Sequence, residues 1–251
     1  MKKYTILAVS LSFLWASAAS ANSLSVVWNI EPIEDYSTET QWFGGGEFVL
    51  KQRLIPQGAV ELLSAAPKKL KTKLGAGDHL VLATAGSLSA FCEHKVYPEK
   101  LFSRKAQTCL VDQDGNGEFE SYFRRFSQTK KGLVALGGKW PKKLKAIPPI
   151  AYKRIEPRNF GADYFVAIER RNFFNIYGKE NFQIAFGSAS SLDRITAPVS
   201  ISSSELPKEV TILGARLTAH EEKDGKMAIS VQRSMPKQPF GIAVTTSYRF
   251  Y

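Results

Sequence analysis

The chain has 251 residues, of which 44% are hydrophobic and 23% are charged. These fractions are typical of a globular protein and exclude an intrinsically disordered chain. Lysine and arginine total 34 against 23 aspartate and glutamate residues, so the formal net charge at pH 7 is +11. A chain with this excess of positive charge attracts anionic partners.

The first residues have the order of a secretory signal peptide. A positive start, "MKK", precedes an apolar run over residues 6–15, and small residues lead to an A-x-A site at residues 19–21. We expect cleavage after Ala21, which leaves residues 22–251 in the periplasm or outside the cell. Because no later run of about 18 apolar residues occurs, the sequence predicts no membrane-spanning helix.

Beyond the leader, apolar residues alternate with a period of two, which is typical of half-buried strands. The pattern predicts one all-β domain over residues 22–251, an antiparallel sandwich or barrel of roughly a dozen short strands. In chain order we expect strands near residues 24–29, 47–54, 59–64, 79–85, 88–95, 107–112, 118–126, 150–155, 163–170, 182–186, 227–231 and 242–250.

The two cysteines, Cys92 and Cys109, lie in the predicted strands "SAFCEHKVY" and "QTCLVD". An oxidising compartment favours one disulfide between neighbouring strands. Closing a loop of this length stabilises a fold by about 3 kcal/mol. A free catalytic thiol is the alternative, and its only local support is the neighbouring His94.

The stretch "DQDGNGEFE", residues 112–120, is called the acidic loop below. Its spacing places candidate calcium ligands on alternating positions, because calcium prefers hard oxygen atoms that converge from such positions. These ligands are the side chains of Asp112, Asp114, Asn116 and Glu120 and the backbone carbonyl of Glu118.

Over these nine residues the acidic loop is similar to calcium loops of the EF-hand and dockerin kind. Position twelve of such a loop holds a bidentate carboxylate, but here it is Phe123. A hairpin tip is the alternative interpretation, because Asp-Gly and Asn-Gly are both favoured turn pairs.

More widely, residues 88–123 resemble uncharacterised secreted proteins of Gram-negative bacteria with a cysteine strand followed by a D-x-D-G-N-G turn. This resemblance implies export and β structure, and no activity.

The positive charge is concentrated between Tyr122 and Arg154, where no aspartate or glutamate occurs. Aromatic residues, among them Trp140 and Tyr152, interleave with the basic ones and can add stacking contacts. For an exported chain the available anions are lipopolysaccharide, lipid headgroups and acidic polysaccharide, whereas intracellular nucleic acid is not expected. An ordinary solvated surface is the alternative. The candidate anion-binding residues are Arg124, Arg125, Lys130, Lys131, Lys142, Lys143 and Lys145.

Three later features complete the organisation of the chain. Paired prolines in "AIPPI", residues 146–150, mark a candidate seam, because proline interrupts a sheet. Asp224-Gly225 predicts a tight hairpin. The terminal "VTTSYRFY" is similar to the last strand of outer-membrane barrels.

No signature of a catalytic site is present: the chain lacks H-E-x-x-H, G-x-S-x-G and a phosphate-binding glycine fingerprint. The sequence therefore favours an exported binding protein or envelope accessory with no catalytic activity. An outer-membrane barrel is the second interpretation, and a secreted hydrolase without a recognisable motif is the third.

Overall fold

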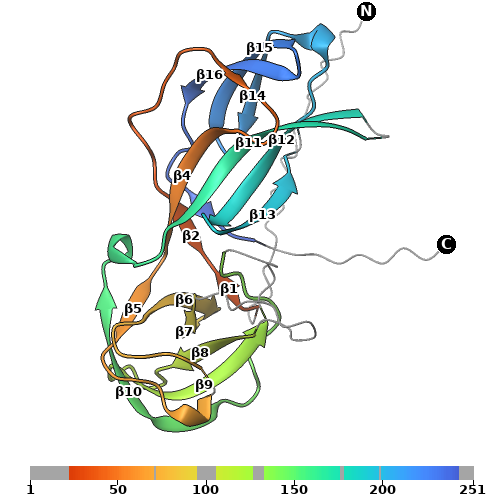
Figure 1. Ribbon diagram of the computed structural model, residues 1–251. Coiled ribbons are helices and arrows are strands. Elements are labelled where there is room, and N and C mark those ends of the chain that lie inside the picture. Colours follow the sequence, from red (N-terminus) through yellow and green to blue (C-terminus); the bar gives the residue numbers. More distant parts are fainter. Residues whose placement is uncertain are drawn as a thin grey trace, which may run out of the picture.

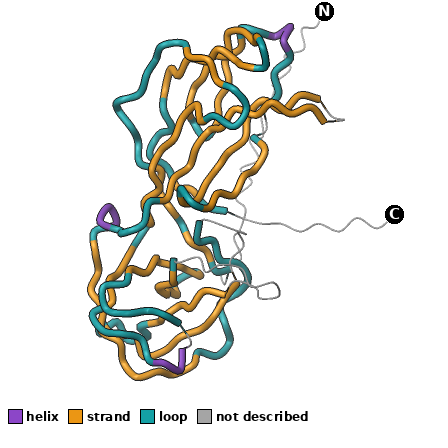
Figure 2. The backbone as a smooth tube through the Cα atoms, viewed as in Figure 1, coloured by secondary structure: helices purple, strands orange, loops and turns teal. Residues whose placement is uncertain are grey.

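A computed structural model describes residues 23–70, 72–94, 106–126, 133–175, 178–197 and 199–242. Within these ranges the backbone is almost entirely strand, as the tube in Figure 2 shows. The helical residues in the described part of the chain form three short 3₁₀ turns, η1 (Lys68–Leu70), η2 (Pro157–Asn159) and η3 (Ser203–Glu205). The predicted all-β, antiparallel fold class is therefore confirmed.

The first sheet closes on itself into a barrel. Its strand order is β1-β6-β5-β10-β9-β8-β7, and a further pairing of β6 with β7 joins six of the strands into a ring. Strands β5 to β10 follow one another around this ring, so it is an up-and-down meander. The strands are β1 (Ser25–Val26), β5 (Ala59–Leu62), β6 (His79–Ala85), β7 (Leu88–Glu93), β8 (Ala106–Val111), β9 (Glu118–Phe126) and β10 (Lys145–Ile155).

The second assembly consists of two open sheets that form a half-barrel, drawn above the barrel in Figure 1. The larger sheet has the order β13-β12-β11-β4-β2-β17, and the smaller has the order β14-β15-β16-β3. The strands of the larger sheet are β2 (Trp28–Ile30), β4 (Phe48–Pro56), β11 (Tyr164–Asn175), β12 (Gly178–Ser188), β13 (Ser191–Thr196) and β17 (Pro239–Phe240). Those of the smaller sheet are β3 (Gln41–Phe43), β14 (Lys208–Ile212), β15 (Ala215–Lys223) and β16 (Lys226–Arg233).

Buried apolar side chains form one core inside each assembly and join the two assemblies. A cluster that includes Leu62, Leu80, Leu110 and Phe119 belongs to the barrel alone. A larger cluster runs from the barrel strands into both sheets of the half-barrel. Trp28 is fully buried in this larger cluster, and its indole N–H donates to the carbonyl of Val134 at 3.1 Å. This bond fastens the segment before β10 to the half-barrel.

The structure refines several predicted strands. The run at residues 24–29 divides at Val27 into β1, which pairs with the barrel, and β2, which pairs with the half-barrel. The strands β3, β13, β14 and β17 were not predicted, because they are short or lack clear alternation. The predicted strand at 242–250 lies outside the described residues, except for Ile242.

The paired prolines do not end a strand. Residues 146–150 lie within β10, and its ladder with β9 shifts register between Ala146 and Ile150. Pro148 and Pro149 are exposed at this irregularity, where their missing N–H groups disturb no regular ladder. The prolines therefore interrupt the register of β10 without ending the strand, and the candidate seam at residues 146–150 stays a prediction.

The hairpin at Asp224-Gly225 is confirmed. Lys223 pairs with Lys226 across the turn, and both central residues have positive φ, 51° at Asp224 and 75° at Gly225. These angles are typical of the primed turns that match the twist of a two-residue hairpin.

Candidate functional site

The acidic loop connects β8 to β9 at one rim of the barrel. Asp112 organises the turn, because its two carboxylate oxygens accept the N–H groups of Gly115 at 2.7 Å and of Gly117 at 3.1 Å. Both glycines have positive φ, 78° and 91°, a backbone conformation that favours glycine. The predicted hairpin turn is therefore present, and its acidic side chains are held close together.

Tyr152 of β10, which is 40 positions further along the chain, also contacts the carboxylate of Asp112. Its hydroxyl donates to Asp112 at 2.8 Å, and its ring stacks on Phe119 with centroids 4.1 Å apart. Burial alone would raise the pKa of Asp112, but this bond and the loop amides outweigh that effect and lower the pKa. Burial, together with the bond to Asp112, raises the pKa of Tyr152 to about 12.

Three acidic side chains of the loop converge. Asp112, Asp114 and Glu120 each offer an oxygen atom, and these atoms lie within 4.8 Å of one another. One oxygen of Glu120 accepts the N–H of Gln113 at 2.6 Å. Its other oxygen, Oε2, is shielded from solvent and has no hydrogen-bond partner among the described residues. The cluster of Asp112, Asp114 and Glu120 could therefore hold a metal ion.

The two other predicted ligands are the side chain of Asn116 and the backbone carbonyl of Glu118, and their part in such a site stays a prediction. The side chain of Asn116 closes the turn, because its amide donates to Asp114 at 3.1 Å and its oxygen accepts the N–H of Glu118 at 2.8 Å. The side chain of Glu118 is exposed. Phe123, at position twelve, is buried in the core and contributes no oxygen. A metal ion here would need oxygen ligands in addition to these three carboxylates.

The register of β9 against β10 brings five of the predicted basic residues to one end of this strand pair. Lys145 pairs with Tyr122, so the last residues of β9 lie beside the residues that precede β10. We call this group the basic end: Arg124, Arg125, Lys142, Lys143 and Lys145. Four of its residues are exposed, and Arg125 is half-buried and donates to the carbonyl of Lys139. Lys130 and Lys131 lie outside the described residues.

An open cleft of about 840 Å³ lies between the acidic loop and the segment that leads into β10. The turn between β6 and β7 contributes to its lining with Ser87, Leu88 and Ser89. The facing segment contributes Trp140 and Lys142. In the sequence, Trp140 is one aromatic residue among basic ones, and no local pattern places it opposite an acidic turn.

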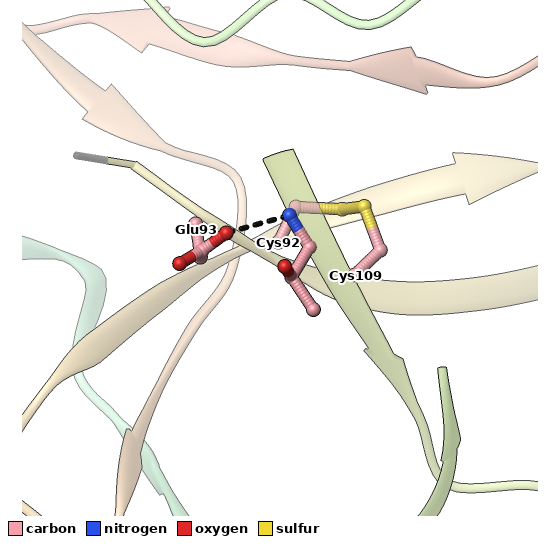
Figure 3. The surroundings of a disulfide bond; sticks show 4 residues. Cys92, Glu93 and Cys109 are labelled. Atoms are coloured by element: carbon pink, nitrogen blue, oxygen red, sulfur yellow. Dashed lines mark hydrogen bonds between the residues drawn. A yellow bond between two sulfur atoms is a disulfide. The ribbon is translucent and has the colours of Figure 1, made fainter. Parts of the chain in front are cut away.

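The cysteines form the predicted disulfide. Cys92 and Cys109 are directly paired across β7 and β8, fully buried, with Cα atoms 4.0 Å apart. The buried carboxylate of Glu93 lies beside the bond and accepts the N–H of Thr108 at 2.6 Å (Figure 3). Because both sulfurs are bonded, the interpretation of a free catalytic thiol does not fit this structure.

Comparison with known proteins finds no matching family model, no similar curated protein and no solved structure that matches. None of the helical turns in the described ranges has the length and apolar character needed to cross a membrane. The fold and the site thus define an antiparallel β protein, built of a meander barrel and a half-barrel, with an acidic cluster and a basic end on the same barrel.

Proposed function

We propose that this chain is an exported binding protein that engages an anionic component of the bacterial envelope and has no catalytic role. The observation that carries the proposal is the basic end. Four exposed cationic side chains that are up to 21 positions apart in the sequence gather at one end of β9 and β10. Such a concentration of charge attracts lipopolysaccharide phosphates, lipid headgroups or acidic polysaccharide.

The acidic loop supports a second part of the proposal, a weak calcium site. Three carboxylates converge there, and the shielded Oε2 of Glu120 lacks a partner among the described residues. Hard carboxylate oxygens suit calcium. Because Phe123 replaces the bidentate carboxylate, we expect a dissociation constant of about 10⁻⁴–10⁻³ M, as in extracellular modules.

The anion-binding role is tested with immobilised heparin and with vesicles that contain lipopolysaccharide. Replacing Lys142, Lys143 and Lys145 together by glutamine should weaken binding, and the dependence of binding on salt should become shallower. The matched control replaces Lys223, Lys226 and Lys237, which are exposed on the half-barrel and carry the same charge. Equal losses in both triple variants would show a response to net charge alone and would contradict a localised site.

The calcium site is tested by titration calorimetry and by thermal melting with and without calcium. Asp114→Ala should abolish the calcium-dependent heat and the rise in melting temperature. Glu118→Gln is the control, because this exposed side chain lies outside the cluster. A wild-type protein that shows neither heat nor stabilisation at millimolar calcium would refute this part of the proposal.

A further inference from the structure

Both walls of the cleft between the acidic loop and Trp140 are held by contacts to the rest of the barrel. On one side, the ring of Trp140 packs against Phe123 with centroids 5.1 Å apart. The backbone just before it is fixed, since Gly138 accepts the N–H of Leu24 at 2.8 Å and Lys139 accepts the guanidinium of Arg125. On the other side, the bonds to Asp112 hold the acidic turn. A ligand would therefore meet a pre-organised site, which lowers the entropic cost of binding.

The lining of the cleft combines apolar, charged and hydroxyl groups. Trp140 and Leu88, which is 43% exposed, offer apolar surface. Lys142 offers a positive charge, and Asp112 and Asp114 offer carboxylates. The carboxylate of Asp112 already accepts two loop amides and the hydroxyl of Tyr152. The hydroxyls of Ser87 and Ser89 donate and accept hydrogen bonds. A large cleft with an apolar wall and a few polar groups is a common form of ligand site.

These groups discriminate between ligand classes. An acyl chain would leave Asp114 and the serines unpaired, which is unfavourable for polar groups removed from water. A neutral sugar would leave Lys142 without a charged partner. A sugar that carries a carboxylate provides a partner for charged groups of both signs in the cleft. Its acid group pairs with Lys142, and its hydroxyls donate to Asp114. Its apolar ring face fits against the indole of Trp140.

We propose that this cleft binds an acidic saccharide unit of the uronic acid type. The ring stacks on Trp140, the sugar carboxylate pairs with Lys142, and sugar hydroxyls bond to Asp114 and to the serines of the β6–β7 turn. This inference rests on the proposed function, because it names the chemical class of the anionic partner and the place where that partner binds. It requires no metal ion, since carboxylate oxygens accept sugar hydroxyls directly.

The test uses a short oligogalacturonate as the ligand and a glucose oligomer of equal length as the neutral control. Binding is measured by calorimetry and by intrinsic tryptophan fluorescence, both in EDTA. We expect the acidic oligomer alone to bind. Lys142→Gln should weaken its binding about tenfold, which corresponds to the loss of one charge-assisted hydrogen bond.

Matched variants separate a local effect from a general one. Trp140→Phe should weaken binding and remove most of the fluorescence change, whereas Trp42→Phe, at an exposed site in β3, should do neither. Lys73→Gln, an exposed lysine outside the cleft, is the charge control for Lys142→Gln. Circular dichroism and melting curves confirm that each variant is folded.

Two results would overturn the inference. One is equal binding of the acidic and neutral oligomers, or of neither, by the folded wild-type protein. The other is a loss of affinity that is as large in Lys73→Gln as in Lys142→Gln. If heparin or lipopolysaccharide still binds through the basic end in either case, the proposed function stands and only the assignment of the cleft fails.

Discussion

Asp112 illustrates how one residue can serve both a fold and a site. Its carboxylate accepts two backbone amides of its own turn and the hydroxyl of Tyr152 from another strand. These bonds favour the ionised form, so the pKa of Asp112 is lowered. The charge that would attract a metal ion is therefore also the charge that closes the acidic loop.

The hydroxyl of Tyr152 provides the first prediction. Tyr152→Phe keeps the stacking on Phe119 but removes the bond to Asp112, so the free energy of unfolding at pH 7 should fall by about 1 kcal/mol. Because the pKa of Asp112 is lowered in the folded state, its contribution is present above the unfolded pKa and is lost as pH falls through the folded pKa. The difference between variant and wild type should therefore shrink below pH 4.

Urea unfolding at pH 7 and at pH 3 measures both values. A difference that is the same at the two pH values would show that the hydroxyl of Tyr152 acts independently of the Asp112 charge. Asp112→Asn provides a comparison, since it removes the charge and should abolish the pH dependence of the Tyr152→Phe effect.

At the scale of elements, the strands with clear alternation of apolar residues were predicted well. The strands whose bounds depend on pairing with another strand were predicted poorly. Strands such as β6 and β9 match the expected ranges closely, because each has one buried face and a turn at its end. The continuation of β10 through Pro148 and Pro149 and the division of the first strand at Val27 were not predicted. Both features depend on strand pairing. The division at Val27 follows from the pairing of β1 with the distant β6, and the strand through the prolines follows from the shifted register of β10 on the preceding strand β9.

The turn between β14 and β15 provides the second prediction. Gly214 has a φ of 76°, and a methyl group at its Cα would lie 2.8 Å from the Cδ atom of Pro236. Gly214→Ala should therefore lower the free energy of unfolding by roughly 3 kcal/mol, through backbone strain and overpacking together.

Gly77→Ala is the matched control for this turn. Gly77 has a similar φ of 81°, but nothing lies within 4 Å of the added methyl group. Its cost should be limited to the backbone term, about 1–2 kcal/mol. Chemical denaturation of both variants measures the difference, and equal costs would show that Pro236 moves away without penalty.

At the scale of the whole molecule, an ion pair joins the two sheets of the half-barrel. The fully buried guanidinium of Arg170, in β11 of the larger sheet, donates to Glu222 in β15 of the smaller sheet at 3.0 Å. It also donates to the carbonyl of Asn181 at 3.0 Å. Burial lowers the pKa of Arg170, and the Glu222 carboxylate opposes this shift.

This pair provides the third prediction. Glu222→Gln leaves the buried positive charge of Arg170 without its counter-charge, so the free energy of unfolding should fall by about 3 kcal/mol. The control is Glu209→Gln, which breaks an exposed pair with Arg216 and should cost less than about 1 kcal/mol. Denaturant titration compares the two variants, and similar losses would argue against the importance of burial at Arg170.

The sequence by itself determined the features that depend on neighbours along the chain. These are the all-β class, most strands, the Asp224-Gly225 hairpin and the acidic loop, including all three members of its cluster. The disulfide was also predictable, because Cys92 and Cys109 lie on strands joined in succession, which usually pair.

The tertiary structure alone decided which distant residues meet. Closure of β10 onto β5 forms the barrel, and the β9–β10 pairing assembles the basic end and brings Tyr152 to Asp112. The cleft likewise needs three separate segments, around residues 87–89, 111–115 and 140–144. Local periodicity specifies which face of a strand is buried, whereas partner and register follow from packing across the whole fold.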